Sequence, residues 1–267
     1  MRRFILVGVS LCAVMAASTG SLSAQMPRGE RFLVQEIALD PSMAIKFREA
    51  MKESVALSVK HGSPYAWTAY RGDDGRYYFL HAIKDLTDVE NMYKYYAGLA
   101  AKDPGAFKAL SGKFSGTYEY TRDAIYTYRS DLSYIPADPY YPPAEMRFIR
   151  LDIWFVEPEK EAEAEQARTE LHALAKAKGV RDVSFCMVGG MGTEQPMYIF
   201  ATPDKDEPEF LKHDAEMWKL VGDDAAATYR RVLPQIRRRE SRRLWYDEEL
   251  SYTPGPEVTV KPKPPVK

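Results

Sequence analysis

The chain has 267 residues, of which 37 are Lys or Arg and 38 are Asp or Glu, so its formal net charge is −1. This balance argues against a nucleic-acid partner, because a polyanionic backbone requires a basic surface. One of the two cysteines, Cys12, lies in an N-terminal apolar run, so the rest of the chain has no internal disulfide. Its stability must come from packing.

The N-terminus has the pattern of a secretory signal. Two arginines follow Met1, an apolar run extends from Phe4 to Ala17, and small residues lead to Ala24. This order is typical of export signals, and the apolar run is shorter than the roughly 20 residues that span a bilayer. We therefore expect residues 1–24 to be removed and the mature protein to be periplasmic or secreted, with no membrane span. The alternative is an uncleaved anchor.

A short motif occurs twice, as Leu132-Ser-Tyr-Ile-Pro136 and Leu250-Ser-Tyr-Thr-Pro254. Arg31-Phe32 is also matched by Arg147-Phe148, at an offset of 116. These matches predict two similar units, each closed by a strand that the repeated motif terminates. The expected divisions are a signal (1–24), a first repeat (25–136), a stiff Pro-rich linker (137–145), a second repeat (146–254) and a disordered Pro- and Lys-rich tail (255–267).

Hydrophobic periodicity predicts the same element order in both repeats. In the first repeat the elements are a strand (31–39), a helix (44–59), a hairpin of two strands (65–70 and 77–83), a helix (88–99), a shorter helix (105–114) and a strand (124–131). In the second they are a strand (147–156), a helix (159–178), two hairpin strands (182–188 and 197–202), a helix (208–218), a last helix kinked at Pro234 (229–239) and a strand (243–250).

The order β-α-β-β-α-β is that of a ferredoxin-like unit, whose helices cover one face of the sheet and leave the other bare. A bare apolar face requires a partner, which the second copy supplies. The topology across residues 31–254 resembles the dimeric α/β-barrel superfamily. The resemblance implies an α+β fold in which two tandem ferredoxin-like repeats pair their sheets into a pseudo-dimeric barrel. It also implies a cavity, between sheet and helices or between the sheets, that suits an apolar or aromatic ligand.

Alternation along the strand at 147–156 predicts which side chains face such a cavity. The expected inward face consists of Phe148, Arg150, Asp152 and Trp154. At the 116 offset, Glu36 is the repeat equivalent of Asp152. The two carboxylates with Arg150 would form a polar cluster with perturbed pKa values. The alternative is a structural salt bridge at the seam between the repeats.

Among the four histidines, His81 is the best candidate for an acid–base group or a haem ligand, because it lies in the middle of an aromatic strand. His213 precedes Trp218 by five residues on a helix, so this helix could line the other side of a cavity. No histidine pair has metal-binding spacing and no Cys-x-x-Cys occurs, so no metal site is predicted. A lone histidine has many structural explanations, so a core or surface position is the favoured interpretation for each of the four.

The leading hypothesis is an exported protein that binds a small apolar or aromatic ligand in a barrel cavity, without a cofactor. The predicted ligand-binding residues are Trp67, His81, Arg150, Asp152, Trp154 and Trp218. The resemblance implies an alternative: a cofactor-free monooxygenase or a haem-dependent enzyme with His81, Glu36 and Asp152 as its working groups. A third possibility is a structural or interaction module, and a homodimer is compatible with each.

Overall fold

The computed structural model describes residues 31–255. The predicted signal at 1–24 and all but the first residue of the predicted tail lie outside this range. Within it, none of the helices has the length and apolar character needed to span a membrane.

The first repeat has the predicted order of elements, and in the second the two helices predicted at 208–218 and 229–239 are replaced by one kinked helix. The first contains β1 (Arg31–Leu39), α1 (Ala44–Lys60), β2 (Thr68–Gly72), β3 (Arg76–Ile83), α2 (Leu86–Lys102), α3 (Pro104–Phe114) and β4 (Tyr118–Tyr128). The second contains β5 (Phe148–Val156), α4 (Glu161–Ala177), β6 (Phe185–Gly189), β7 (Met197–Asp204), α5 (Glu207–Val232) and β8 (Ile236–Tyr246).

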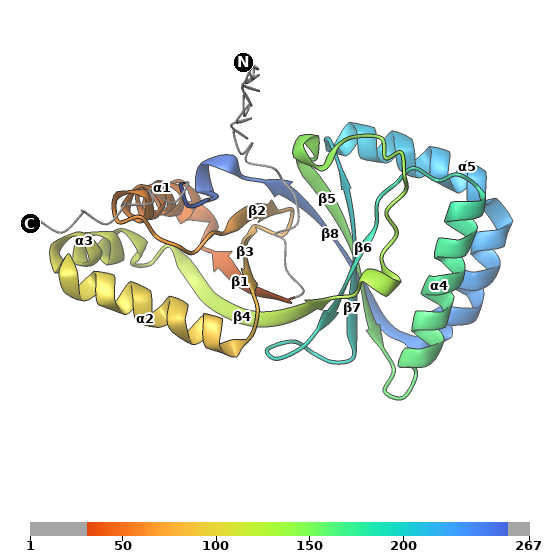
Figure 1. Ribbon diagram of the computed structural model, residues 1–267, viewed down its shortest axis with the longest axis horizontal. Helices are drawn as coiled ribbons and strands as arrows, with labels where there is room; N and C mark the ends of the chain where they lie inside the picture. Colours follow the sequence, from red (N-terminus) through yellow and green to blue (C-terminus); the bar gives the residue numbers. More distant parts are fainter. Residues whose placement is uncertain (1–30, 256–267) are drawn as a thin grey trace, which may run out of the picture.

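The two sheets close into one eight-stranded barrel in the order β1-β3-β2-β8-β5-β7-β6-β4. Antiparallel pairing of β2 with β8 and of β4 with β6 joins the repeats. Helices α1 to α3 lie outside the first sheet, and α4 and α5 lie outside the second (Figure 1). The predicted pairing of tandem ferredoxin-like repeats into an α/β barrel is therefore confirmed.

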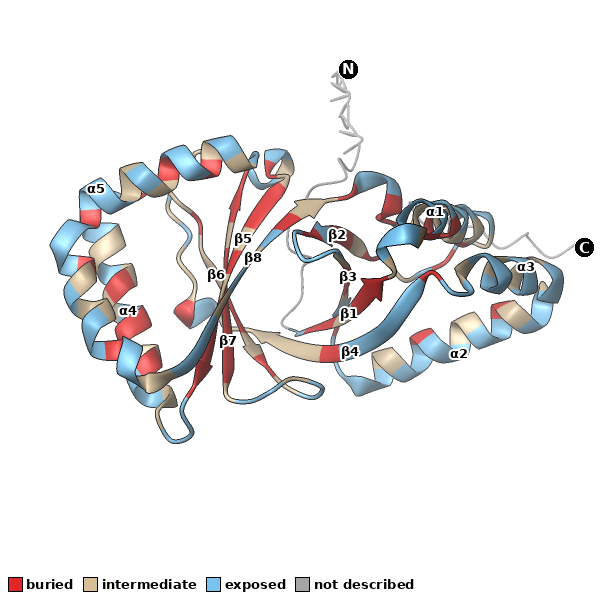
Figure 2. Cartoon of the chain, turned by 180° about the vertical axis from the view of Figure 1, so that it is seen from behind, coloured by how far each residue is buried: buried red, intermediate tan, exposed pale blue. Residues whose placement is uncertain are grey.

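Burial follows this arrangement (Figure 2). The strands at the centre are mostly buried, and α4 buries the side that faces its sheet. In contrast, the first halves of β4 and β8 are largely exposed. The interior of the barrel, which we call the bore, is therefore apolar over most of its length and polar where these two strands begin.

The predicted inward face of β5 is wrong. Residues of the other face line the bore, namely Ile149, Leu151, Ile153 and Phe155. The apolar face of β5 fills the bore, and the face that carries Arg150 and Asp152 meets the helices. The repeats are also related by a register of 117, not 116. A pairing shift falls between Ala38 and Leu39 in β1 and between Phe155 and Val156 in β5. An error of one residue moves every side chain of a strand to the opposite face.

The bend in the last helical segment also differs from the prediction. Helix α5 changes direction at Gly222, whose φ of 44° lies in the region that favours glycine. Pro234 instead lies in a short turn between α5 and β8, and the strand begins at Ile236. Arg239, expected in the helix, is therefore in β8. The two parts of α5 enclose the outer face of the second sheet together with α4 (Figure 1).

Candidate functional site

Three of the cavities lined by residues 31–255 exceed 200 Å³. The bore has a volume of about 260 Å³. The first-repeat cavity, of about 400 Å³, lies between the first sheet and its helices. The second-repeat cavity, of about 610 Å³, lies between the second sheet and helices α4 and α5. We take the last as the candidate site because it is the largest of the three and brings several predicted residues together.

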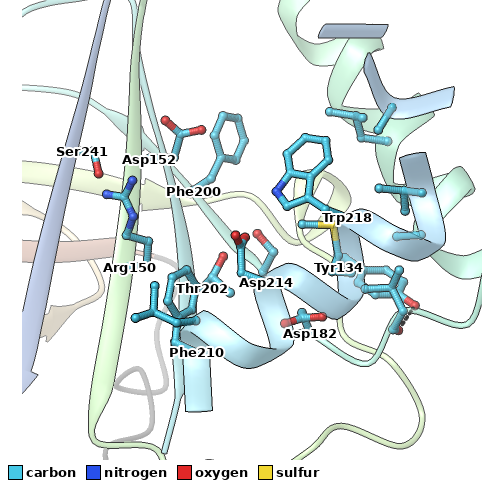
Figure 3. Close-up of a pocket in the computed structure, with 18 of the residues that line it drawn as sticks. Tyr134, Arg150, Asp152, Asp182, Phe200, Thr202, Phe210, Asp214, Trp218 and Ser241 are labelled. Carbon is cyan, nitrogen blue, oxygen red and sulfur yellow. Dashed lines mark hydrogen bonds between the residues drawn. The ribbon is translucent and has the colours of Figure 1, made fainter. Parts of the chain in front are cut away.

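Arg150 and Asp152 of β5 and Trp218 of α5 line the second-repeat cavity. Figure 3 shows the first two on the sheet side, with Trp218 and Asp214 on the helix side. Trp154 lies behind the wall, is 1% exposed, and donates its indole N–H to Asp152 Oδ2 at 2.9 Å. Four of the predicted ligand-binding residues thus meet at one site, although the face was expected to point into the bore.

Aromatic and aliphatic side chains form about half of the walls, and polar and charged ones form the rest. Asp214 and Trp218 share a face of α5 because they are four residues apart. The remaining apolar lining residues include Tyr134, Phe148, Phe200, Phe210, Met217, Val221 and Tyr229. Such a surface suits the flat face of an aromatic ligand.

The arginines of the cavity differ in their partners. Arg239 donates to both oxygens of Asp152, at 2.6 and 2.8 Å, and Arg243 donates to Glu207 at 2.9 Å. Arg150 is half-buried, and within the described residues its guanidinium donates one hydrogen bond, to the backbone carbonyl of Leu151 at 3.3 Å. Arg168 also forms no ion pair with a carboxylate of the described chain, but it is buried and donates to the Leu132 carbonyl and to Ser184. Arg150 is therefore the partly exposed guanidinium of the cavity that forms no ion pair within the described residues.

Two carboxyl groups of the cavity are shifted toward their neutral form. Burial raises the pKa of Asp182 to about 6, and its Oδ2 has no hydrogen-bond partner among residues 31–255. Burial also raises the pKa of Asp214, although Arg150 and a hydrogen bond with Trp218 oppose the shift. Perturbed carboxyl groups in a cavity are candidates for binding or proton transfer.

His172 of α4 also lines the cavity, although it was not among the predicted ligand-binding residues. Its buried Nε2 has no partner in the described part of the chain. Burial and the charge of Arg168 lower the pKa of His172 to about 3, so it is neutral at physiological pH. The four-residue spacing of Arg168 and His172, which places both on one side of α4, was a signal that could have found it.

Trp67 and His81 belong to the first-repeat cavity, so the structure does not bring them to the other predicted residues. Burial lowers the pKa of His81 to about 4, outweighing a hydrogen bond with the Ala66 backbone. Its buried Nδ1 has no partner among the described residues. A neutral imidazole with an unpaired nitrogen is chemically suited to a haem iron, so His81 is the residue that would hold haem in this cavity.

Glu36 lies elsewhere again, in the bore, where it accepts from Arg122 at 2.8 Å and from Tyr120 at 3.0 Å. The expected cluster of Glu36, Asp152 and Arg150 is therefore wrong, because the register of 117 places the two carboxylates on opposite faces of the barrel wall. His213 does not line the second-repeat cavity; it is buried against Asp204, at 2.8 Å.

No family model matches the sequence, and no curated protein matches it significantly. Solved structures do. An anthrone oxidase-like protein matches with a TM-score of 0.55 at 14% identity, covering 90% of this chain and 99% of its own. A protein of Fusobacterium nucleatum named as a monooxygenase matches with a TM-score of 0.52 at 12% identity, covering 82% and 93%. The chain has the dimeric α/β-barrel fold.

A chlorite dismutase from Candidatus Nitrospira defluvii matches with a TM-score of 0.49 at 10% identity, covering 83% of this chain and 93% of its own. The two matches with TM-scores above 0.5 establish the shared dimeric α/β-barrel fold, and at 12% and 14% identity they establish no activity. Function on a common fold is decided by the site. Within residues 31–255 no group of three or more His, Cys, Asp or Glu side chains is arranged to hold a metal ion.

Proposed function

We propose that the protein binds a small aromatic molecule with an anionic group in the second-repeat cavity. The observation that carries this proposal is Arg150, a half-buried guanidinium that faces an aromatic-walled cavity and has no carboxylate partner among the described residues. A guanidinium offers two parallel N–H donors to a carboxylate, and partial burial strengthens the attraction. The aromatic walls would pack against the rings of the ligand.

The neighbouring carboxyl groups favour this arrangement. Asp152 is neutralised by Arg239, while Asp182 and Asp214 have raised pKa values. The Asp152 charge is thereby paired, and raised pKa values let Asp182 and Asp214 take up a proton more readily when an anion binds near them.

The test compares 2-naphthoate with 2-naphthamide, which have the same rings and differ in charge, by calorimetric titration. We expect the acid to bind at least about tenfold more tightly, since a charged hydrogen bond contributes about 1.5–3 kcal/mol. Arg150→Gln should remove this preference. Arg243→Gln is the matched control, because Arg243 lies beside Arg150 in the sheet register and is paired with Glu207. Equal affinity for both compounds, or an unchanged preference in Arg150→Gln, would refute the proposal.

A second candidate function is cofactor-free oxidation of the bound aromatic molecule, favoured by Asp214. Burial makes its carboxylate a stronger base, and it lies beside Trp218 at the cavity. Similarity to an anthrone oxidase-like protein and to a named monooxygenase supports this candidate. In the proposed reaction Asp214 removes a proton from an activated CH2 group. O2 accepts the electrons, one of its oxygen atoms becomes the new carbonyl, and the other leaves as water.

Oxygen uptake with anthrone, followed by mass spectrometry of the product, tests this activity. Asp214→Asn should abolish uptake and leave naphthoate binding in place. Glu216→Gln, on the same helix but not among the residues lining the cavity, serves as the control. No uptake by the parent protein would exclude anthrone oxidation and would leave the binding proposal standing.

We also propose that the protein is exported, on the strength of the N-terminal pattern. Mass spectrometry of the protein from a periplasmic fraction should give a chain that starts close to Gln25. An intact Met1 in that fraction would count against cleavage.

A further inference from the structure

The bore is separate from both sheet–helix cavities and faces the inside of the barrel. Its wall is formed mainly by aliphatic side chains, among them Leu80, Ile149, Leu151, Ile153, Ile199 and Leu244. An eight-stranded barrel is just wide enough to be filled by its own side chains or to hold one small ligand. Here about 260 Å³ is left open. Protein interiors are otherwise packed closely, so an open apolar space of this size favours an occupant.

A buried hydroxyl group specifies one feature of that occupant. Tyr70 is 1% exposed, lines the bore, and its Oη has no hydrogen-bond partner in the described part of the chain. Buried polar atoms are nearly always hydrogen-bonded, so an unpaired one points to a missing partner. Burial raises the pKa of Tyr70 well above its usual value, so the hydroxyl keeps its proton and is a donor. An acceptor on the occupant would satisfy this donor.

Among the described residues, the polar end of the bore offers no unpaired charge to a ligand. Glu36 accepts from Arg122, and Arg242 donates to Tyr78 at 2.8 Å and to Glu240 at 2.9 Å. The other charged lining residues are also in ion pairs, Arg76 with Asp74 and Arg238 with Glu194. An ionic ligand would have to break one of these pairs, whereas an uncharged ligand would not.

We propose that the bore is a second binding site, which takes a small uncharged molecule that is mainly apolar and carries one carbonyl or ether oxygen for the Tyr70 hydroxyl. A short-chain ketone belongs to this class. The site is independent of the aromatic-anion site proposed above, because the second-repeat cavity lies on the other face of the sheet.

Methionine methyl NMR can test the site, because different methionines line the three cavities. Met187 and Met197 line the bore, Met217 lines the second-repeat cavity, and Met51 and Met92 line the first-repeat cavity. Titration of the full-length protein with 2-hexanone should shift the methyl signals of Met187 and Met197 and leave that of Met217 in place. Naphthoate should do the reverse, so failure of one proposal is distinguishable from failure of the other.

Tyr70→Phe keeps the ring and removes the donor. We expect it to weaken 2-hexanone binding by about tenfold, the effect of one lost hydrogen bond, and to leave binding of hexane unchanged. Tyr126→Phe, which alters another tyrosine of the bore, is the control and should retain parental affinity for both probes.

Three outcomes would overturn the proposal: no shift of Met187 and Met197 at saturating 2-hexanone, equal loss of affinity in Tyr70→Phe and Tyr126→Phe, or tighter binding of hexanoate than of 2-hexanone.

Discussion

Leu132 and Leu250 occupy equivalent positions in the two repeats, and each is buried in the core of the other repeat. Leu132, at the end of the first repeat, packs with Trp154 and Val156 of the second. Leu250, at the end of the second, is fully buried beside Phe47 of the first. In each repeat the Leu-Ser-Tyr motif follows the last strand and packs into the core of the other repeat. These reciprocal contacts hold the two repeats together.

The serines of the motif also contact the other repeat. Ser133 Oγ accepts from the Cys186 backbone N–H at 2.8 Å, and Ser251 Oγ accepts from that of Ala69 at 2.9 Å. Each hydroxyl also donates to a carbonyl four residues earlier, at 2.7 Å. Trp67 donates its indole N–H to the Leu250 carbonyl at 2.7 Å, which fixes this predicted ligand-binding residue as part of the junction.

Truncation of either leucine should loosen the opposite repeat. Leu250→Ala should cost about 2–5 kcal/mol of unfolding free energy, as buried leucines usually do, and lower hydrogen-exchange protection first in α1 and β2. Leu132→Ala should lower protection first in α4 and β6. Leu86→Ala, at an exposed position, should change little. Loss of protection confined to the repeat that carries the mutation would contradict the packing of each leucine into the other repeat.

Glu36 and Asp152 should contribute to stability independently. They lie on β1 and β5, and three strands separate these two in either direction around the barrel. Urea unfolding of Glu36→Gln, Asp152→Asn and the double variant should give a coupling energy within about 0.5 kcal/mol of zero. The comparison cycle pairs Glu36→Gln with Arg122→Gln, which are in contact and should couple by about 1 kcal/mol. Equal coupling in both cycles would show that the two carboxylates interact.

The neutral His81 should make the fold sensitive to acid. Its pKa is about 4 in the folded chain and near 6.5 when unfolded. As the pH falls below 6.5 the unfolded imidazole takes up a proton that the folded one does not, so stability falls until about pH 4. Between pH 7 and pH 5 the parent should lose about 2 kcal/mol more than His81→Phe in urea unfolding. An identical loss in both proteins would exclude the effect.

Cys186 should be inert in the folded protein. It is fully buried, and burial raises the pKa of its thiol to about 12, so little thiolate is present at neutral pH. Reaction with a disulfide reagent should be at least about a hundredfold slower in buffer than in urea. The variant Cys186→Ala identifies any signal that Cys12 contributes. Rapid labelling of Cys186 in buffer would indicate that the second repeat opens readily.

The sequence by itself determined the number of repeats, the order of their elements and the closure into a barrel. These depend on local periodicity, on turn residues such as Gly62 and Gly179, and on the need of a bare apolar sheet for a partner. The repeated motif located the end of each unit for the same reason. The motif could not show that Leu132 and Leu250 each pack into the other repeat, because equivalent residues have the same local pattern wherever they pack.

Only the tertiary structure decided which face of each strand meets which cavity. Alternation with a period of two separates the two faces of a strand but does not say which face meets the helices, and two short matches could not fix the register between the repeats. Arg150 and Asp214 come together from distant parts of the chain, and Glu36 is held away from both. Burial sets the pKa of Asp182 and leaves Tyr70 unpaired, and burial depends on contacts that no local pattern records.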